Sequence, residues 1–128
     1  MNIKFDHISL SAKNPEKMRD FLVALLDVKV GTRAKLSFDG YFLFAGDKDV
    51  IHIFGQSQPG KHNATEASEQ NIVHHISFFS DNYKDVMDRI SSLDLHYSIK
   101  QASDSSKVQI FVRAPENLMI EIQAVPPK

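Results

Sequence analysis

The 128-residue sequence contains no cysteine, which excludes disulfide bonds, thiolate metal ligands and a cysteine nucleophile. It has no apolar run near the length of about 20 residues that a membrane-spanning helix requires, and its first residues lack the apolar segment of a secretory signal. The formal net charge is only −1, and the basic residues are scattered rather than clustered. These absences predict a cytoplasmic protein that binds a small-molecule substrate, with no nucleic acid and no membrane as partner.

The composition is that of an ordinary globular domain. Hydrophobic residues make up 42% of the chain and charged residues 24%. A chain of this length is expected to bury roughly two-thirds of the surface that it exposes when unfolded. We therefore expect a single domain over residues 1–128, built around one core.

The sequence contains an internal repeat. Residues 6–10 (DHISL) are echoed by residues 74–78 (HHISF), with an offset of 75 − 7 = 68, and residues 50–53 (VIHI) are echoed by residues 119–122 (MIEI), with an offset of 121 − 52 = 69. A repeat of this kind predicts two copies of one supersecondary unit. Each copy contributes two potential metal ligands, and the four residues are His7, His52, His75 and Glu121.

The first half of the chain predicts a β-α-β-β-β module. Asn14-Pro15-Glu16 marks a helix start, because asparagine caps a helix, proline is tolerated at its first position and an acid faces its dipole. Apolar residues then recur at helical spacing, which predicts one face packed on a sheet: Met18, Phe21, Leu22 and Leu25. Strands are predicted over Ile3–Ser11, Arg33–Phe38, Tyr41–Ala45 and Asp49–Phe54, with turns at Asp39-Gly40 and Gly46-Asp47.

The second half predicts the same order of elements. Asp81-Asn82 is expected to cap a helix with the apolar stripe Tyr83, Val86, Met87, Ile90 and Leu93. Strands are predicted over Ile72–Ser80, Leu95–Lys100, Lys107–Arg113 and Leu118–Ala124. Module one is thus placed at about residues 1–55 and module two at about residues 71–125. The polar segment from Gly55 to Gln70 is expected to join them and to pass near the cleft.

Residues 110–121 (IFVRAPENLMIE), together with a histidine in each first strand, carry a family resemblance. The sequence resembles the vicinal oxygen chelate superfamily, which groups glyoxalase I, extradiol dioxygenases, methylmalonyl-CoA epimerase, fosfomycin-resistance enzymes and bleomycin-resistance proteins. It departs from that family's Asp-Pro-Asp-Gly turn at Ala114, Glu116 and Asn117. The resemblance covers nearly the whole chain and implies an α+β fold, in which the curved mixed sheets of two modules pair around a metal-binding cleft. It also implies a homodimer, and leaves open whether the modules pair within one chain or across the dimer.

The resemblance implies that His7, His52, His75 and Glu121 bind one divalent metal ion. Isoleucines flank His52 and Glu121 in their strands, so alternation leaves a single polar side chain on the opposite face of each strand. Three imidazoles and a carboxylate suit Ni, Co, Zn, Mn or Fe and do not select among them. Glu121 is also the candidate catalytic base.

Four residues on the penultimate strands are candidates for lining an apolar substrate pocket: Phe42, Phe44, Gln109 and Phe111. His74 neighbours His75 with the opposite strand parity, so its side chain is expected to point away from the metal.

The preferred function is that of a metal-dependent enzyme with glyoxalase-like lyase or isomerase chemistry. His52 argues against this function, because the resemblance implies a carboxylate or amide at this position in many isomerising members of the family. An Fe(II) ring-cleaving dioxygenase using His7, His75 and Glu121 is one alternative. A protein of the bleomycin-resistance type that sequesters a drug or metabolite is another.

Overall fold

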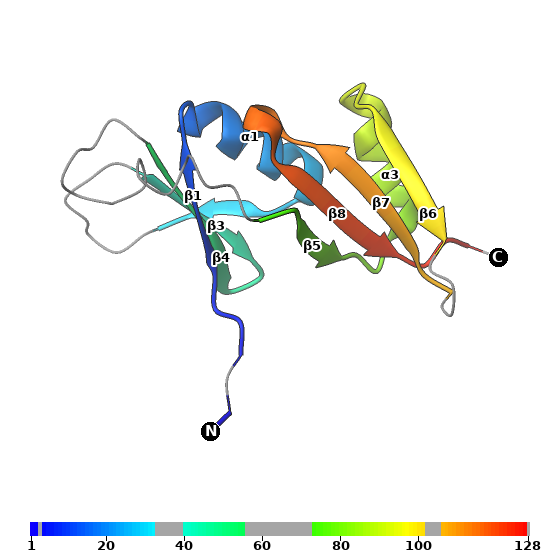
Figure 1. The fold of residues 1–128 in the computed structure, drawn as a ribbon, viewed down its shortest axis with the longest axis horizontal. Coiled ribbons are helices and arrows are strands. Elements are labelled where there is room, and N and C mark those ends of the chain that lie inside the picture. Colours follow the sequence, from blue (N-terminus) through cyan, green and yellow to red (C-terminus); the bar gives the residue numbers. More distant parts are fainter. Residues whose placement is uncertain (3, 33–39, 56–72, 102–105, 128) are drawn as a thin grey trace. The chain divides into compact units, whose positions relative to one another are not determined.

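The computed structural model describes residues 1–2, 4–32, 40–55, 73–101 and 106–127. Its contacts divide the chain into two compact units, Met1–Val23 with Asp27–Asn71, and Ala24–Leu26 with Ile72–Lys128. Each unit holds one four-stranded sheet (Figure 1). Among the described residues, no helix is long and apolar enough to cross a membrane.

The first unit contains β1 (Ile8–Ala12), α1 (Pro15–Leu26), β2 (Lys29–Gly31), β3 (Gly40–Ala45) and β4 (Lys48–Gly55). Its sheet has the order β1-β4-β3-β2, with β1 parallel to β4 and the other pairs antiparallel.

The second unit repeats this plan with β5 (Ile76–Phe79), α3 (Tyr83–Ser92), β6 (Tyr97–Gln101), β7 (Val108–Arg113) and β8 (Met119–Ala124). A short 3₁₀ turn, η1 (Pro115–Asn117), joins β7 to β8. The sheet order is β5-β8-β7-β6, and β5 is the strand parallel to its neighbour. The prediction of an α+β fold with two β-α-β-β-β modules is confirmed.

Both helices begin where the sequence predicts. The side chain of Asn14 accepts a hydrogen bond from the backbone N–H of Lys17 at 3.0 Å, and Asn82 accepts one from Asp85 at 3.0 Å. These contacts satisfy backbone donors that a helix start leaves unpaired. The predicted apolar stripes supply the buried side chains of the two helices: Met18, Leu22 and Leu25 on α1, and Val86 and Ile90 on α3.

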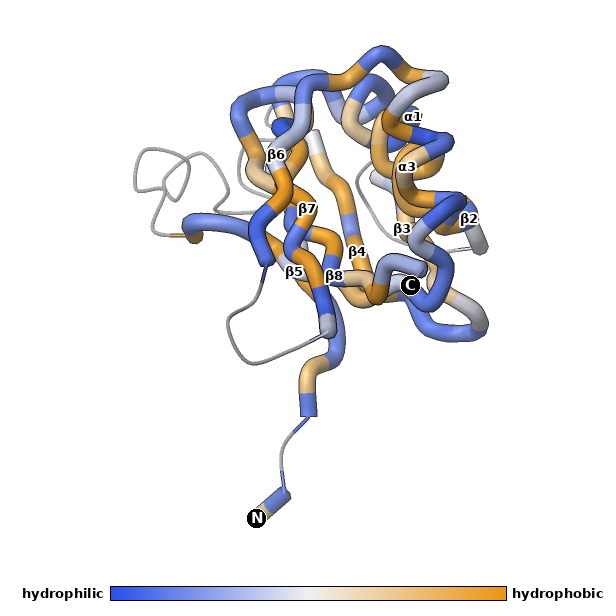
Figure 2. The backbone as a smooth tube through the Cα atoms, turned by 90° about the vertical axis from the view of Figure 1, so that its right-hand side faces the viewer, coloured by the Kyte–Doolittle hydropathy of each residue, from blue (hydrophilic) through white to orange (hydrophobic). Residues whose placement is uncertain are grey.

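The central strands β4 and β8 have one fully buried face each. Ile51 and Ile53 are 1% and 0% exposed, and Ile120 and Ile122 are 0% and 2% exposed. A single polar residue stands between the isoleucines of each strand, His52 in β4 and Glu121 in β8, and Figure 2 shows a hydrophilic band that interrupts the apolar course of β4. Each of these polar residues therefore lies on the other face of its own sheet.

The first strand of each module is shorter than predicted. β1 begins at Ile8 rather than Ile3, and β5 begins at Ile76 rather than Ile72. The reason is pairing, since these outer strands find a ladder partner only from Ile8 opposite Ile51 and from Ile76 opposite Ile120. His7 and His75 accordingly lie just before their strands, not within them.

The strand predicted over Arg33–Phe38 lies outside the described residues, as does the segment from residue 56 to Gln70. A short strand that the sequence did not indicate, Lys29–Gly31, pairs with β3. Gly31 is required there, because an added Cβ would collide with the ring of Phe44.

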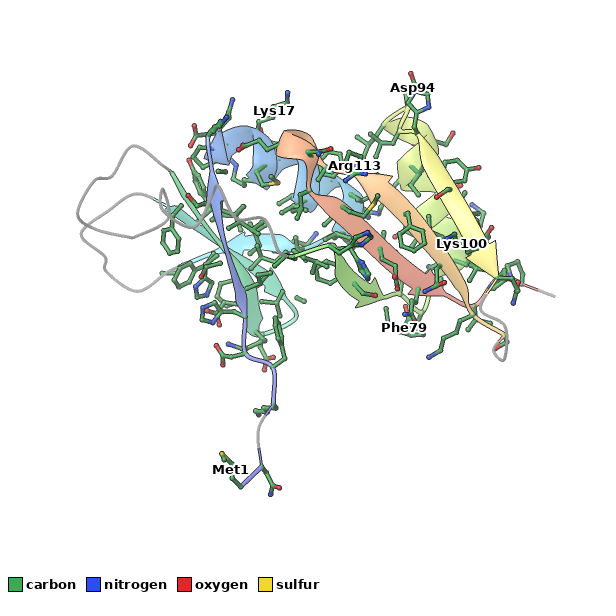
Figure 3. All side chains as sticks on the ribbon, in the orientation of Figure 1. Met1, Lys17, Phe79, Asp94, Lys100 and Arg113 are labelled. Carbon is green, nitrogen blue, oxygen red and sulfur yellow. The ribbon has the colours of Figure 1, made fainter. Side chains whose placement is uncertain are left out.

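The C-terminus of α3 has a left-handed residue that is not glycine. Asp94 has a φ of 53°, and its side chain stands at the tip between α3 and β6 (Figure 3). Its N–H donates to the carbonyl of Ser91, while Leu95 donates to Ile90, both at 3.1 Å. This is the Schellman pattern, in which glycine is favoured at the left-handed position.

Replacing Asp94 with glycine is expected to raise the free energy of unfolding by up to about 1 kcal/mol, because the left-handed conformation costs a non-glycine residue roughly 1–2 kcal/mol, partly offset by unfolded-chain entropy. Urea denaturation would measure the change. Asp88→Gly, within α3, is the control and should lower stability by about 1 kcal/mol. Equal losses in both variants would contradict the prediction.

Candidate functional site

His52 lies at the centre of a polar and aromatic cluster in the first unit. Its neighbours across the sheet are Ser9 on β1 and Phe42 on β3. The rings of Phe42 and His52 stack at 3.8 Å between centroids with an interplanar angle of 7°. His7, two residues before Ser9, stacks on the opposite face of His52 at 3.8 Å and 16°. The structure thus brings together the two candidate ligands of the first module.

Each of these histidines also contacts a carboxylate. His7 Nδ1 lies 2.7 Å from Asp6 Oδ2, and His52 Nε2 lies 2.6 Å from Asp49 Oδ2. Lys48 Nζ bridges the two acids at 3.1 Å from Asp6 and 3.0 Å from Asp49. The contacts with His52 and then Lys48 hold the pKa of Asp49 far below its usual range, and those with His7 and then Lys48 lower the pKa of Asp6.

Glu121 occupies the corresponding position in the second unit. Its neighbours across the sheet are Ser77 on β5 and Phe111 on β7, and it is only 3% exposed. Glu121 Oε2 accepts hydrogen bonds from Ser77 Oγ at 2.7 Å and from Gln123 Nε2 at 2.8 Å. Its other oxygen, Oε1, lies 3.3 Å from His75 Nε2. The second pair of candidate ligands is therefore also in contact.

Hydrogen bonding outweighs burial at Glu121. Burial raises the pKa of this carboxyl group, but hydrogen bonds from Gln123 and Ser77 and the attraction of His75 bring the pKa below its ordinary value, with a further hydrogen bond from Gln109. The group is consequently ionised at neutral pH. An ionised carboxylate is the form that binds a cation or accepts a proton.

His74 is exposed and contacts His75. Its Nδ1 lies 2.9 Å from His75 Nδ1, and the two rings meet edge to face. That its side chain points away from a bound metal stays a prediction. Strict alternation of side chains holds only in a strand, and both residues precede β5.

The predicted pocket residues divide into two groups. Phe42 stacks on His52, Phe111 meets the ring of His75 edge-on at 6.1 Å, and Gln109 hydrogen bonds to Glu121. Phe44 instead lies against Gly31. Whether any of them lines a substrate pocket stays a prediction.

The sequence interpretation missed four residues that hold the candidate ligands: Asp6, Asp49, Ser77 and Gln123. Ser77 had a visible signal, because it belongs to the repeated His-Ile-Ser motif and keeps the parity of His75. Asp49 had none, since strict alternation places it on the opposite face from His52, and the register shift between Leu43 and Phe44 brings it onto the same face.

The donor chemistry of the two pairs fits a divalent metal. Nitrogen Nε2 of His7 and nitrogen Nδ1 of His52 are the ring atoms that do not face a carboxylate. Carboxylate contacts of this kind commonly orient metal-binding histidines. Among the residues that the structure describes, no group of three or more His, Asp or Glu side chains could hold a metal ion. A four-ligand site would need both pairs.

Sequence and structure comparisons identify the family and the fold. The model of the Glyoxalase/Bleomycin resistance protein/Dioxygenase superfamily matches residues 4–122. The chain belongs to this superfamily. No curated protein matches the sequence.

Several solved structures share the superfamily fold with this chain. An integron cassette protein from V. cholerae is 16% identical with a TM-score of 0.73, covering 98% of both chains. Lactoylglutathione lyase from Agrobacterium tumefaciens is 13% identical with a TM-score of 0.70, covering 97% of this chain and 95% of that one. The fosfomycin resistance protein FosX from Listeria monocytogenes is 16% identical with a TM-score of 0.69, covering 97% and 94%. These likenesses establish the fold and not the reaction.

Acid is expected to destabilise the metal-free protein. Asp49 and Glu121 have folded-state pKa values below their ordinary values of 3.8 and 4.5. A lowered pKa contributes stability that is present above the unfolded-state pKa and is lost as pH falls through the folded-state pKa. The free energy of unfolding should therefore decline as pH falls below about 5. Urea denaturation of chelator-treated protein between neutral and acidic pH would measure this. In Glu121→Gln, the free energy of unfolding should decline less steeply with falling pH. An unchanged slope would contradict the lowered pKa of Glu121.

Proposed function

We propose that this protein is a metal-dependent small-molecule enzyme of the superfamily, with lyase or isomerase chemistry of the glyoxalase kind. The proposed ligands of one divalent ion are His7, His52, His75 and Glu121. The observation that carries the proposal is the equivalence of the two sheets. Each presents a Ser–ligand–Phe row across three strands, with a histidine two residues before the serine in contact with the ligand.

A bound divalent ion would supply Lewis acidity toward two neighbouring oxygens of a substrate. Around it, this chain's own residues would hold the ligands in place. Ser77 and Gln123 both donate to Oε2 of Glu121, whereas Oε1 faces the candidate ligand His75 at 3.3 Å. We assign the ligand role, and the role of proton acceptor, to Glu121 Oε1.

The same ligands support a second candidate function. His7, His75 and Glu121 form the two-histidine, one-carboxylate combination that Fe(II) oxygenases use. In that case His52 would be dispensable for binding iron. A third reading, sequestration of a drug or metabolite as in bleomycin resistance, requires ligand binding and no turnover.

One experiment separates these functions. Protein purified without added metal would be analysed for its metal content, then loaded with Ni, Co, Mn, Fe or Zn and tested on diketones with thiols, on catechols and on aromatic drugs. We expect about one metal per chain and turnover of a hemithioacetal. Oxygen uptake with a catechol would favour the dioxygenase. Tight ligand binding without turnover in every metal form would refute the enzyme proposal.

We further propose a cytoplasmic homodimer. Tyr97 and Ile99, on the outer strand β6, are 49% and 40% exposed, and Phe79 at the end of β5 is 58% exposed. Exposed apolar side chains on outer strands favour association with a second sheet. A stable dimer would bury about 800 Å² per partner.

A further inference from the structure

Five side chains of the first unit form a closed circuit of contacts. Asp6 Oδ2 lies 2.7 Å from His7 Nδ1 and 3.1 Å from Lys48 Nζ. Lys48 Nζ lies 3.0 Å from Asp49 Oδ1, and Asp49 Oδ2 lies 2.6 Å from His52 Nε2. The stacked rings of His52 and His7 close the circuit at 3.8 Å. The two candidate ligands are thus tied to each other through one shared lysine.

We propose that Asp6 and Asp49, linked by Lys48, are positioning residues that fix His7 and His52 in opposite tautomers. A neutral imidazole carries its proton on one nitrogen, and a carboxylate acceptor decides which nitrogen that is. Asp49 keeps the proton of His52 on Nε2 and leaves Nδ1 bare. Asp6 keeps the proton of His7 on Nδ1 and leaves Nε2 bare. Metal binding by the bare nitrogens rests on the proposed function. The assignment of the tautomers is independent of it.

The repeat shows that this circuit is not a requirement of the module fold. With the offset of 69, the residues equivalent to Lys48 and Asp49 are Asn117 and Leu118, and with the offset of 68 the residue equivalent to Asp6 is His74. The second module forms the same strand pairs without a lysine or a carboxylate at these positions. Only the module with two candidate histidine ligands carries the circuit, which favours a role at those ligands.

Burial predicts which half of the circuit is stronger. The side chains of His52 and Asp49 are 11% and 27% exposed, whereas those of His7 and Asp6 are 34% and 67% exposed. A charge-assisted hydrogen bond is screened less where water is excluded. Lys48 lowers the repulsion between the two acids, so that both can face their histidines at once. Loss of Asp49 should therefore disturb the site more than loss of Asp6.

The tautomers can be measured without any metal. Nitrogen NMR of ¹⁵N-histidine-labelled, chelator-treated protein would be recorded at a pH well above about 6.5, where free imidazole is neutral. We expect the Nε2–H form at His52 and the Nδ1–H form at His7. The second result is the sharper one, because free imidazole side chains prefer the Nε2–H form. Asp6→Ala should shift His7 toward that preferred form, and Asp49→Ala should give His52 a mixture. Identical tautomers at both histidines, or spectra unaffected by the two variants, would overturn the proposal.

Metal affinity supplies the second readout. Titration with Co²⁺, followed by its visible absorption, should show roughly 10–100-fold weaker binding in Asp49→Ala, the usual effect of losing an outer-shell partner. Asp49→Asn keeps the shape of the side chain, but an amide can donate as well as accept a hydrogen bond. Its Co²⁺ affinity should therefore lie between that of Asp49→Ala and that of the unmodified protein. Asp47→Ala is the matched control, because it removes an exposed carboxylate from the same turn and should bind Co²⁺ as tightly as the unmodified protein.

The two proposals can fail separately. If the unmodified protein takes up no Co²⁺ but has the expected tautomers, the metal function fails and the positioning roles stand. If Co²⁺ binds equally well to the unmodified protein and to Asp49→Ala, with His52 in the same tautomer, the positioning role fails and the metal site stands.

Discussion

Replacing Glu121 with alanine is expected to weaken Co²⁺ binding by at least about 100-fold, since loss of an outer-shell partner alone has an effect of roughly 10–100-fold. Glu121 is the only carboxylate among the four proposed ligands, and its charge is maintained by donors from Ser77 and Gln123. His7→Ala should have an effect of similar size. Titration followed by visible absorption would measure both.

The alanine variant also leaves the donors of Ser77 and Gln123 without their acceptor. Ser77 is exposed and Gln123 half-buried, so water can replace part of the lost contact and the cost should stay below the roughly 1–3 kcal/mol of a buried group. Glu121→Gln is therefore needed as a second variant of nearly equal shape. It should lose Co²⁺ affinity while keeping a cooperative unfolding transition. Glu116→Ala, which changes an exposed acid in the β7–β8 turn, is the control and should bind normally. Full affinity in Glu121→Gln would remove Glu121 from the ligand set.

Mixing the two alanine variants shows where the site is built. If the pairs His7–His52 and His75–Glu121 meet within one chain, a mixture of His7→Ala and Glu121→Ala chains should bind no more Co²⁺ than either variant alone. If they meet across a homodimer, mixed dimers should regain one intact site. Co-refolding the two variants before titration would ensure exchange of subunits.

The fold could be predicted from the sequence because local and repeated signals agreed. Asn14 and Asn82 cap their helices through side-chain contacts that depend only on nearby residues. The isoleucines around His52 and Glu121 predicted one buried face in each central strand. The starts of β1 and β5 could not be predicted, because they depend on pairing with a strand that is about forty residues away in sequence.

The site was predictable only as far as strand register extends. The sequence placed Phe42 and Phe111 on the strands preceding those of His52 and Glu121, and in the structure each is the cross-strand neighbour of its candidate ligand. The circuit through Lys48 was not predictable, because Asp6 lies in the segment before β1, where no periodicity fixes the side-chain direction. Asp49 begins the predicted strand Asp49–Phe54, in which strict alternation directs its side chain away from the face of His52, and only the register shift between β3 and β4 reverses this.

Introducing a second carboxylate at His52 is expected to raise proton-transfer turnover of a hemithioacetal by about 100-fold, within the range that a positioned general base contributes. The variant must combine His52→Glu with Asp49→Asn. Asp49 Oδ2 lies 2.6 Å from His52 Nε2, so the single change would set two carboxylates against each other. Asp49→Asn alone is the control, and Co²⁺ titration would verify that the double variant keeps its metal, since a carboxylate oxygen is also a competent ligand.

The outcome decides between the enzyme classes, because each assigns His52 a different role. Higher hemithioacetal turnover in the double variant than in Asp49→Asn supports glyoxalase-like chemistry limited by the missing carboxylate. Unchanged turnover with metal bound would mean that a second carboxylate is not what the site lacks. A dioxygenase would instead tolerate His52→Ala, with oxygen uptake on a catechol depending on His7, His75 and Glu121. The stacking of His52 between His7 and Phe42, at 3.8 Å on each side, makes Phe42→Leu the matched test of packing. It should lower stability, and it should leave the preference between the two substrates unchanged if Phe42 only packs against His52 and does not line the predicted substrate pocket.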